Sequence, residues 1–386
     1  MTGSTEQRRE PAETLRTERI VRQYTEKVLD YRQMELETAE LGNKRLLERL
    51  GHLSRESSEL KAQLLETRNQ LKTKNKDLKH VRTHVPQLQA KRNEITEAEA
   101  REAYRSLCDK VQHWVQDRLP TTLDLLFSGR MKKSSAAQSA NLLTLVREPG
   151  KSCLAVHESE EYHVTAAIMY YLWLAVFSKP FYCPLDDSGD NSTLTWIAGI
   201  ERSMAKSRDI ERCREWRSET LKALSSQTSF KSRRDSHLLM LSNDLSSYLS
   251  SVFPHIPTRE LQKSLHRTIV GPSADLAHKL DTSANIFWLK WPLKTAGSRL
   301  EVYECFDVAD GGRTVDFSKM APDSAIRRHT KYLFDIAPGL FVEKVESGKK
   351  MALRSVCRPR VLVHTDEENL VRKATLLTWV HNAASC

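Results

Sequence analysis

A leucine repeat in the first third of the chain limits the fold more than any other feature. Counting from Leu46 in alternating steps of four and three residues, eleven of the fifteen positions up to Ile95 are apolar. On a helix this spacing places the apolar side chains along one narrow face, which is the pattern of a coiled coil. The repeat positions that we expect to form a dimer interface are Leu46, Leu50, Leu53, Leu60, Leu64, Leu71, Leu78 and Val81.

The apolar face needs a second helix to cover it, and two arrangements satisfy the pattern. A parallel homodimer would bring Glu56 near Lys61 and Asp77 near Arg82 of the other chain, and both pairs have opposite charge. An antiparallel hairpin, in which the chain folds back on itself, would use the same leucines. We expect the homodimer, and the orientation of its two helices stays open.

The composition of the same region agrees with a rod. Only three of the 27 aromatic residues and two of the 13 prolines lie before residue 114, so residues 1–117 lack the large side chains of a globular core. Pro86 removes a helical N–H group, and we expect the regular coiled coil to end near His84.

The rest of the chain predicts a helical body followed by strands. Leu238, Leu241, Leu245 and Leu249 form a helical stripe, whereas residues 299–308 alternate like a strand before the Gly311-Gly312 turn. The expected fold class is mainly α, with a long N-terminal coiled-coil helix, a helical region and a small C-terminal α+β domain with a short antiparallel sheet. The expected parts are a disordered N-terminus (1–14), a coiled coil (15–85), an amphipathic connecting helix (87–118), a helical body (119–284) with linkers near 128–150 and 186–193, and a small antiparallel sheet plus C-terminal helix (285–386).

More local expectations follow from the same patterns. The expected helices cover 159–178, 194–227, 235–253, 257–268 and, at the C-terminus, 367–382. The expected strands cover 285–291, 299–308, 314–317, 340–346, 351–357 and 360–364.

A basic stretch inside the repeat suggests contact with nucleic acid. Residues 68–82 have a net charge of +5, and the candidate contacts are Arg68, Lys72, Lys76, Lys79 and Arg82. Without interleaved aromatic or base-reading side chains such contact would be independent of nucleotide sequence. In a leucine-zipper transcription factor the basic region precedes the zipper, but here residues 18–45 have balanced charge. The alternative is a solvated face of the coiled coil.

The motifs of common enzymes are absent. The chain has no G-x-G-x-x-G, G-x-x-x-x-G-K-[ST], G-x-S-x-G or H-E-x-x-H motif. The one grouping that resembles a metal site pairs Glu160 and His163 with Asp275 and His278, and a polar helix start is the simpler reading of it. We therefore predict a non-enzymatic protein with no catalytic residues, metal or cofactor.

A short basic segment points to a modification site. Arg233-Arg234-Asp235-Ser236 resembles a basophilic kinase site, and Ser236 would lie at the start of the helix expected from residue 235. Phosphate there would be stabilised by the helix dipole. The alternative is that Asp235 or Ser236 is the N-cap of that helix.

The sequence also bears on the compartment. Seven scattered cysteines form no C-x-x-C pair, and the N-terminus has no apolar segment of the kind a signal peptide needs. The longest apolar stretch, residues 164–177, is too short to span a bilayer. We expect a cytoplasmic or nuclear protein that is not secreted.

One part of the chain resembles a known family. Residues Gly271 to Leu280, followed by Phe287-Trp288-Leu289-Lys290-Trp291-Pro292, resemble uncharacterised coiled-coil proteins of filamentous ascomycete fungi. The resemblance implies an N-terminal coiled coil ahead of a C-terminal domain, and it assigns no activity, cofactor or site residue. We predict an intracellular interaction or scaffold protein with an unidentified protein partner, the alternative being a nucleic-acid-associated regulator.

Overall fold

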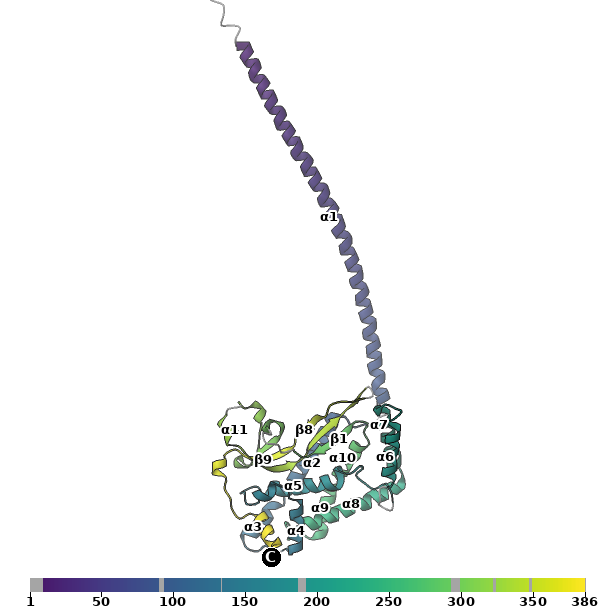
Figure 1. Cartoon of the computed structure of the whole chain (residues 1–386), viewed down its shortest axis with the longest axis vertical. Coiled ribbons are helices and arrows are strands. Elements are labelled where there is room, and N and C mark those ends of the chain that lie inside the picture. The colour runs from purple at the N-terminus through teal and green to yellow at the C-terminus, as the bar shows by residue number, and fades with distance from the viewer. Residues whose placement is uncertain are drawn as a thin grey trace, which may run out of the picture. The chain divides into compact units, whose positions relative to one another are not determined.

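The computed structural model describes residues 10–89, 94–132, 134–186, 192–292, 299–321, 324–346 and 349–385. The chain divides into two compact units, Met1–Asn93 and Glu94–Cys386, which are treated one at a time. Figure 1 labels the helix of the first unit and several helices and strands of the second.

The first unit is a single helix, α1 (Glu10–Gln89), whose 80 residues measure about 120 Å at a rise of about 1.5 Å each. Its abundant leucine, glutamate, lysine and arginine residues favour helix, and no side chain between residues 16 and 77 is buried. The long helix is confirmed. The antiparallel hairpin is wrong, because one uninterrupted helix cannot fold back on itself.

The two ends of this helix bear on the expected boundaries. The disordered segment was expected to reach residue 14, but α1 begins at Glu10, and residues 1–9 lie outside the described ranges. The helix continues through Pro86 to Gln89, and the expected end of the regular coiled coil near His84 stays a prediction. A proline removes one backbone N–H donor and disfavours helix for the residue before it, and α1 ends three residues after this one.

The second unit is built around α2 (Glu97–Gln116). Thr96 caps this helix, since its hydroxyl accepts from the Glu99 N–H while the Glu99 carboxylate accepts from the Thr96 N–H. The predicted amphipathic face is confirmed, and it includes Tyr104 and Trp114. Both side chains are buried in the body's main hydrophobic cluster, so α2 is a core helix of the body and not a connector.

The other described helices complete the second unit. They are α3 (Leu119–Phe127), α4 (Ala136–Leu145), α5 (Glu160–Leu172), α6 (Ser192–Met204), α7 (Ile210–Ser225), α8 (Thr228–Leu249), α9 (Thr258–Leu265), α10 (Gly271–Asp281), α11 (Ala325–His329) and α12 (Leu376–Ala384). Figure 1 shows β1, β8 and β9 on one side of the body, α3, α4, α8 and α9 on the other, and α5 between them.

Two predicted segments of the helical body need correction. The supposed linker near 128–150 contains α4, which Ser135 and Gln138 cap reciprocally and whose Leu142 and Leu145 are buried. The helix expected over 194–227 is divided into α6 and α7, because Asp209 caps a new helix by accepting from the Arg212 N–H. The break expected near 186–193 falls mostly on residues 187–191, outside the described ranges.

The described strands form three small sheets. They are β1 (Ile286–Lys290), β2 (Glu304–Asp307), β3 (Arg313–Val315), β4 (Lys331–Ala337), β5 (Gly339–Glu343), β6 (Val345–Glu346), β7 (Lys349–Lys350), β8 (Arg354–Cys357) and β9 (Arg360–His364). Their orders are β1-β5-β8, β3-β2-β9-β4 and β6-β7.

The pairing within these sheets is mostly as predicted. The strands β2 and β3 pair antiparallel across the glycine turn, and β5 pairs antiparallel with β8. The pair β2–β9 is parallel, however, so the four-stranded sheet is mixed. Strand β4 was not predicted, because five consecutive residues from Leu333 to Ala337 are buried and no alternation marks it.

The expected border at residues 284 and 285 does not separate two cores. Leu289 of β1 and Leu340 of β5 belong to the same hydrophobic cluster as Leu172 of α5 and Leu245 of α8. The apolar face of a sheet and the apolar stripe of a helix must each be buried against another element, and here they are buried against each other.

Gly312 marks a close approach between the glycine turn and α5. Its φ is +81°, and a Cβ at this position would lie 1.7 Å from the Tyr162 hydroxyl oxygen. Gly311 next to it also has a positive φ, of +59°, but a Cβ there would have no neighbour within 4 Å. Glycine at 312 is thus required both by backbone conformation and by space.

Candidate functional site

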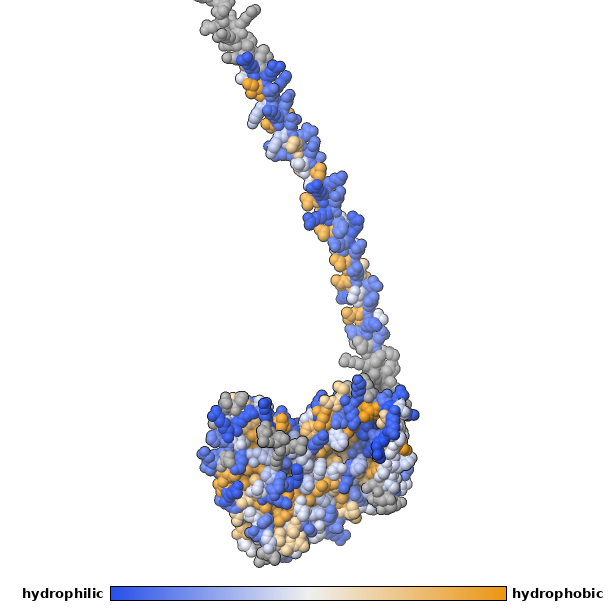
Figure 2. All heavy atoms as spheres, in the orientation of Figure 1, coloured by the Kyte–Doolittle hydropathy of each residue, from blue (hydrophilic) through white to orange (hydrophobic). Residues whose placement is uncertain are grey.

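The predicted interface leucines lie exposed along α1. The exposed fractions of the six described members range from 54% to 68%, and Figure 2 shows hydrophobic side chains recurring along the helix among hydrophilic ones. These six are Leu46, Leu50, Leu53, Leu60, Leu64 and Leu71. The side chains of Leu78 and Val81 lie outside the described part of the chain.

Exposure alone does not distinguish the repeat from its neighbours. Leu65 is 63% exposed and Leu64 is 68% exposed, yet only Leu64 falls on a repeat position. The difference between them is angular, since adjacent helical residues point about 100° apart. Leu65 therefore offers an internal control for any role of the repeat.

The basic stretch is also on this helix. Arg68, Lys72 and Lys76 are exposed, whereas the side chains of Lys79 and Arg82 lie outside the described residues. Lys72 and Lys76 fall between the repeat positions Leu71 and Leu78 and away from the leucine face. Contact with an anion and pairing of the leucines would hence use different faces.

Ser236 is exposed but not at a helix start. The helix α8 begins at Thr228, with Gln227 as its N-cap, so Ser236 is its ninth residue. The expected start at residue 235 is wrong because the buried Phe230 extends the helix upstream. A phosphate on Ser236 would lie beyond the first turn, where the dipole has little effect.

The metal-like grouping does not assemble. His163 Nδ1 lies 2.9 Å from the Ser159 carbonyl oxygen and Nε2 lies 3.1 Å from that of Gly150, so both ring nitrogens are engaged. Burial lowers the pKa of His163. Asp275 is paired with Arg234 at 2.5 Å. Among the described residues no three His, Cys, Asp or Glu side chains are placed to hold a metal ion.

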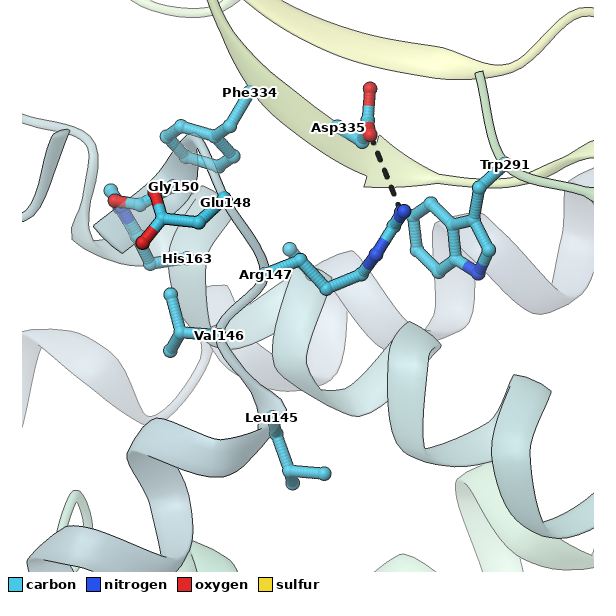
Figure 3. A pocket seen from close by; sticks show the side chains of 10 residues that line it. Leu145, Val146, Arg147, Glu148, Gly150, His163, Trp291, Phe334 and Asp335 are labelled. Carbon is cyan, nitrogen blue, oxygen red and sulfur yellow. Dashed lines mark hydrogen bonds and ion pairs between the residues drawn. The ribbon is translucent and has the colours of Figure 1, made fainter. Parts of the chain in front are cut away.

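The sequence analysis missed an ion pair between Arg147, which follows the end of α4, and the buried Asp335 of β4, drawn in Figure 3. Arg147 Nη1 lies 3.3 Å from Asp335 Oδ2, and the guanidinium carbon lies 4.5 Å from the centre of the Trp291 ring. The Tyr332 hydroxyl also donates to Asp335, whose side chain is only 2% exposed.

This cluster is a structural one. The adjoining space measures about 10 Å³, enough for one water molecule at most. Arg147 neutralises the buried carboxylate of Asp335, and the pair joins two segments that are 188 residues apart in sequence. No local motif could have indicated it, because each partner is an ordinary residue in its own segment.

A second buried charge lies at the end of α10. Asp281 accepts a hydrogen bond from the Tyr182 N–H at 3.2 Å. Burial raises the pKa of Asp281 to about 7, against the opposing effects of that hydrogen bond and of Arg217 and Arg214. The carboxyl group is therefore held protonated in the folded state at mildly acidic pH.

This shift predicts a pH-dependent effect of the Asp281→Asn variant. Because the folded pKa is above the ordinary value of 3.8, the unfolded state loses its proton first, and stability declines as pH rises from 3.8 to about 7. Asparagine does not titrate, so the free energy of unfolding of the variant should not decline in this way. Relative to wild type it should rise by at most about 1.4 kcal/mol per pH unit between pH 3.8 and about 7. Urea unfolding at several pH values measures this, and a difference independent of pH would contradict it.

The six cysteines that the structure describes provide no reactive group. The six described cysteines are free and buried, and burial raises the pKa of Cys108 and Cys183 to about 11 each. A thiol is nucleophilic as its thiolate. These side chains are therefore core residues.

Comparisons with known proteins leave the family open. The chain matches no protein-family model, no curated protein and no solved structure. The resemblance to fungal coiled-coil proteins stays a prediction. Across the described ranges, none of the helices combines the length and the apolar character needed to cross a membrane.

Proposed function

We propose that this protein is a non-enzymatic interaction or scaffold protein of the cytoplasm or nucleus. It homodimerises through α1 and presents its body to another protein. The observation that supports this most is the row of exposed leucines at coiled-coil spacing on an 80-residue helix without buried side chains between residues 16 and 77.

The physical reason lies in the stability of a lone helix. Helices in proteins gain most of their stability from packing an apolar face and little from intrinsic propensity. Burying one leucine side chain contributes about 1.5–3 kcal/mol, and α1 offers six described leucines per chain for burial. A second copy of the chain presents the same face with the same register, so the two faces are complementary.

Light scattering on the full-length protein tests the proposal directly. The expected molar mass at micromolar concentration is twice the 44.3 kDa of one chain. A single mass of 44.3 kDa would rule the dimer out.

A second candidate function follows from the exposed cations of α1. Nonspecific binding to nucleic acid would weaken as salt rises. The logarithm of the binding constant would fall linearly with the logarithm of the salt concentration, with a slope of about −0.9 per phosphate contact. The double variant Lys72→Glu, Lys76→Glu should abolish retention of a random DNA duplex at low salt, measured by gel shift. Reversal of Lys27 and Lys44, in the charge-balanced region, is the matched control. Equal loss in both variants, or no shift by wild type, would remove this candidate.

A further inference from the structure

A polar groove of about 510 Å³ lies on the body, beside the start of α2. Its lining includes Arg101 and Arg105 of α2, Thr314 of β3, Ser355 of β8, and Arg358. Both β3 and β8 are outermost in their sheets. The groove thus lies between the edges of two sheets and one helix.

Three guanidinium groups dominate the charge of the groove. Arg105 is exposed and has no hydrogen-bond or ion-pair partner among the described residues. Arg101 is exposed too, and it donates its Nε–H to the Val356 carbonyl oxygen at 3.0 Å, which leaves its terminal nitrogens outside that bond. Arg358 also lines the groove, and its Nη1 lies 3.9 Å from Asp316 Oδ1.

The two carboxylates of the groove are already engaged. Glu304 lies 3.3 Å from Nε of the buried Arg360. Asp316 accepts from the N–H and the hydroxyl of Ser318, and these hydrogen bonds contribute to lowering its pKa. Since the acids are compensated by other groups, Arg101 and Arg105 leave a positive charge that a ligand can neutralise.

The backbone of β3 adds a second recognition element. This strand pairs with β2 along one edge only. No backbone hydrogen bond joins its other edge to any residue in the described ranges. Such an edge can pair with an added extended chain, in which alternate side chains point to the same side.

We propose that this groove binds an acidic segment of a partner protein in extended conformation. The segment adds to the free edge of β3, and its alternate carboxylates pair with Arg101 and Arg105. Strand addition supplies backbone hydrogen bonds, and the arginines supply the preference for acidic sequence.

The inference rests on the proposed interaction function and names the chemistry of the partner. It does not depend on dimerisation. A Leu64→Glu variant that is monomeric should still bind the segment, so failure of the dimer and failure of the groove can be told apart.

Fluorescence anisotropy of the full-length protein with a labelled dodecapeptide of alternating glutamate and threonine tests the proposal. We expect saturable binding that Arg105→Glu weakens at least about tenfold, because the variant replaces an attraction by a repulsion. Arg105→Ala, which introduces no repulsion, should weaken it less. Arg259→Glu is the matched control: Arg259 is exposed on α9 and does not line the groove.

Three further probes separate the possible ligands. A peptide of alternating glutamine and threonine tests charge, an equally acidic peptide interrupted by prolines tests strand addition, and a thymidine dodecanucleotide tests nucleic acid. All three should bind at least about tenfold more weakly than the acidic peptide. The proposal is overturned if Arg105→Glu binds like wild type, if any of the three probes binds as well as the acidic peptide, or if wild type binds none.

Discussion

Replacing Leu64 by glutamate should convert the proposed α1 dimer of the full-length protein into a monomer. In a paired α1, each copy of the variant places a carboxylate in the apolar contact, and neither has a cation opposite it. Burying an unpaired charge in this way costs about 3–5 kcal/mol, which corresponds to a dissociation constant raised by about two to four orders of magnitude. Light scattering across a concentration series measures the change in molar mass.

Leu65→Glu is the control for this prediction. The two leucines are adjacent, and their exposed fractions are 68% and 63%, so the two variants change the free helix almost equally. Only Leu64 belongs to the repeat. If both variants lower the molar mass to the same extent, the leucine face is not the interface, and if neither does, α1 does not hold the dimer together.

The Gly312→Ala variant should destabilise the body by about 3 kcal/mol or more. A Cβ at this position would lie 1.7 Å from the Tyr162 hydroxyl oxygen, and the φ of +81° is itself unfavourable for alanine. Tyr162 is buried and packs against Phe306, with ring centres 6.3 Å apart, so it has little freedom to withdraw. Urea unfolding followed by tryptophan fluorescence measures the loss, since all seven tryptophans are in the second unit.

Two variants separate the steric effect from the backbone effect. Gly311→Ala imposes a similar strain at φ +59° without any close neighbour, and it should cost only about 1 kcal/mol. In the Tyr162→Phe background the hydroxyl oxygen is gone, although the ring carbon 3.0 Å away remains, so Gly312→Ala should be partly tolerated. Equal losses in Gly311→Ala and Gly312→Ala would show that the contact with Tyr162 has no role.

Local patterns predicted the elements that depend on their own residues. The leucine repeat predicted α1, and the stripe from Leu238 to Leu249 predicted most of α8. In an amphipathic helix the apolar residues recur at a spacing of three or four, so the helix can be recognised from its own sequence. The Gly311-Gly312 pair located the turn between β2 and β3, since both residues need a positive φ. Each of these signals lies within one segment.

Segments without a local period were missed or misread. The Ser/Ala-rich sequence of α4 suggested a linker, yet the α5 and α12 helices on either side of it give its leucines a place to be buried. The buried strand β4 shows no alternation. In both segments tertiary packing, and not intrinsic preference, determines the structure.

The amino-acid sequence by itself determined that this protein has a long helix with one apolar face, followed by a helical body and a small set of strands. The reason is that period and turn chemistry act over a few residues. Only the tertiary structure decided that the expected connecting helix α2 is a core element, that β2 and β9 run parallel, and that Arg101, Arg105 and Arg358 line one groove. Some of these relations join residues more than 250 positions apart in the sequence. They depend on how whole helix and sheet faces pack against one another.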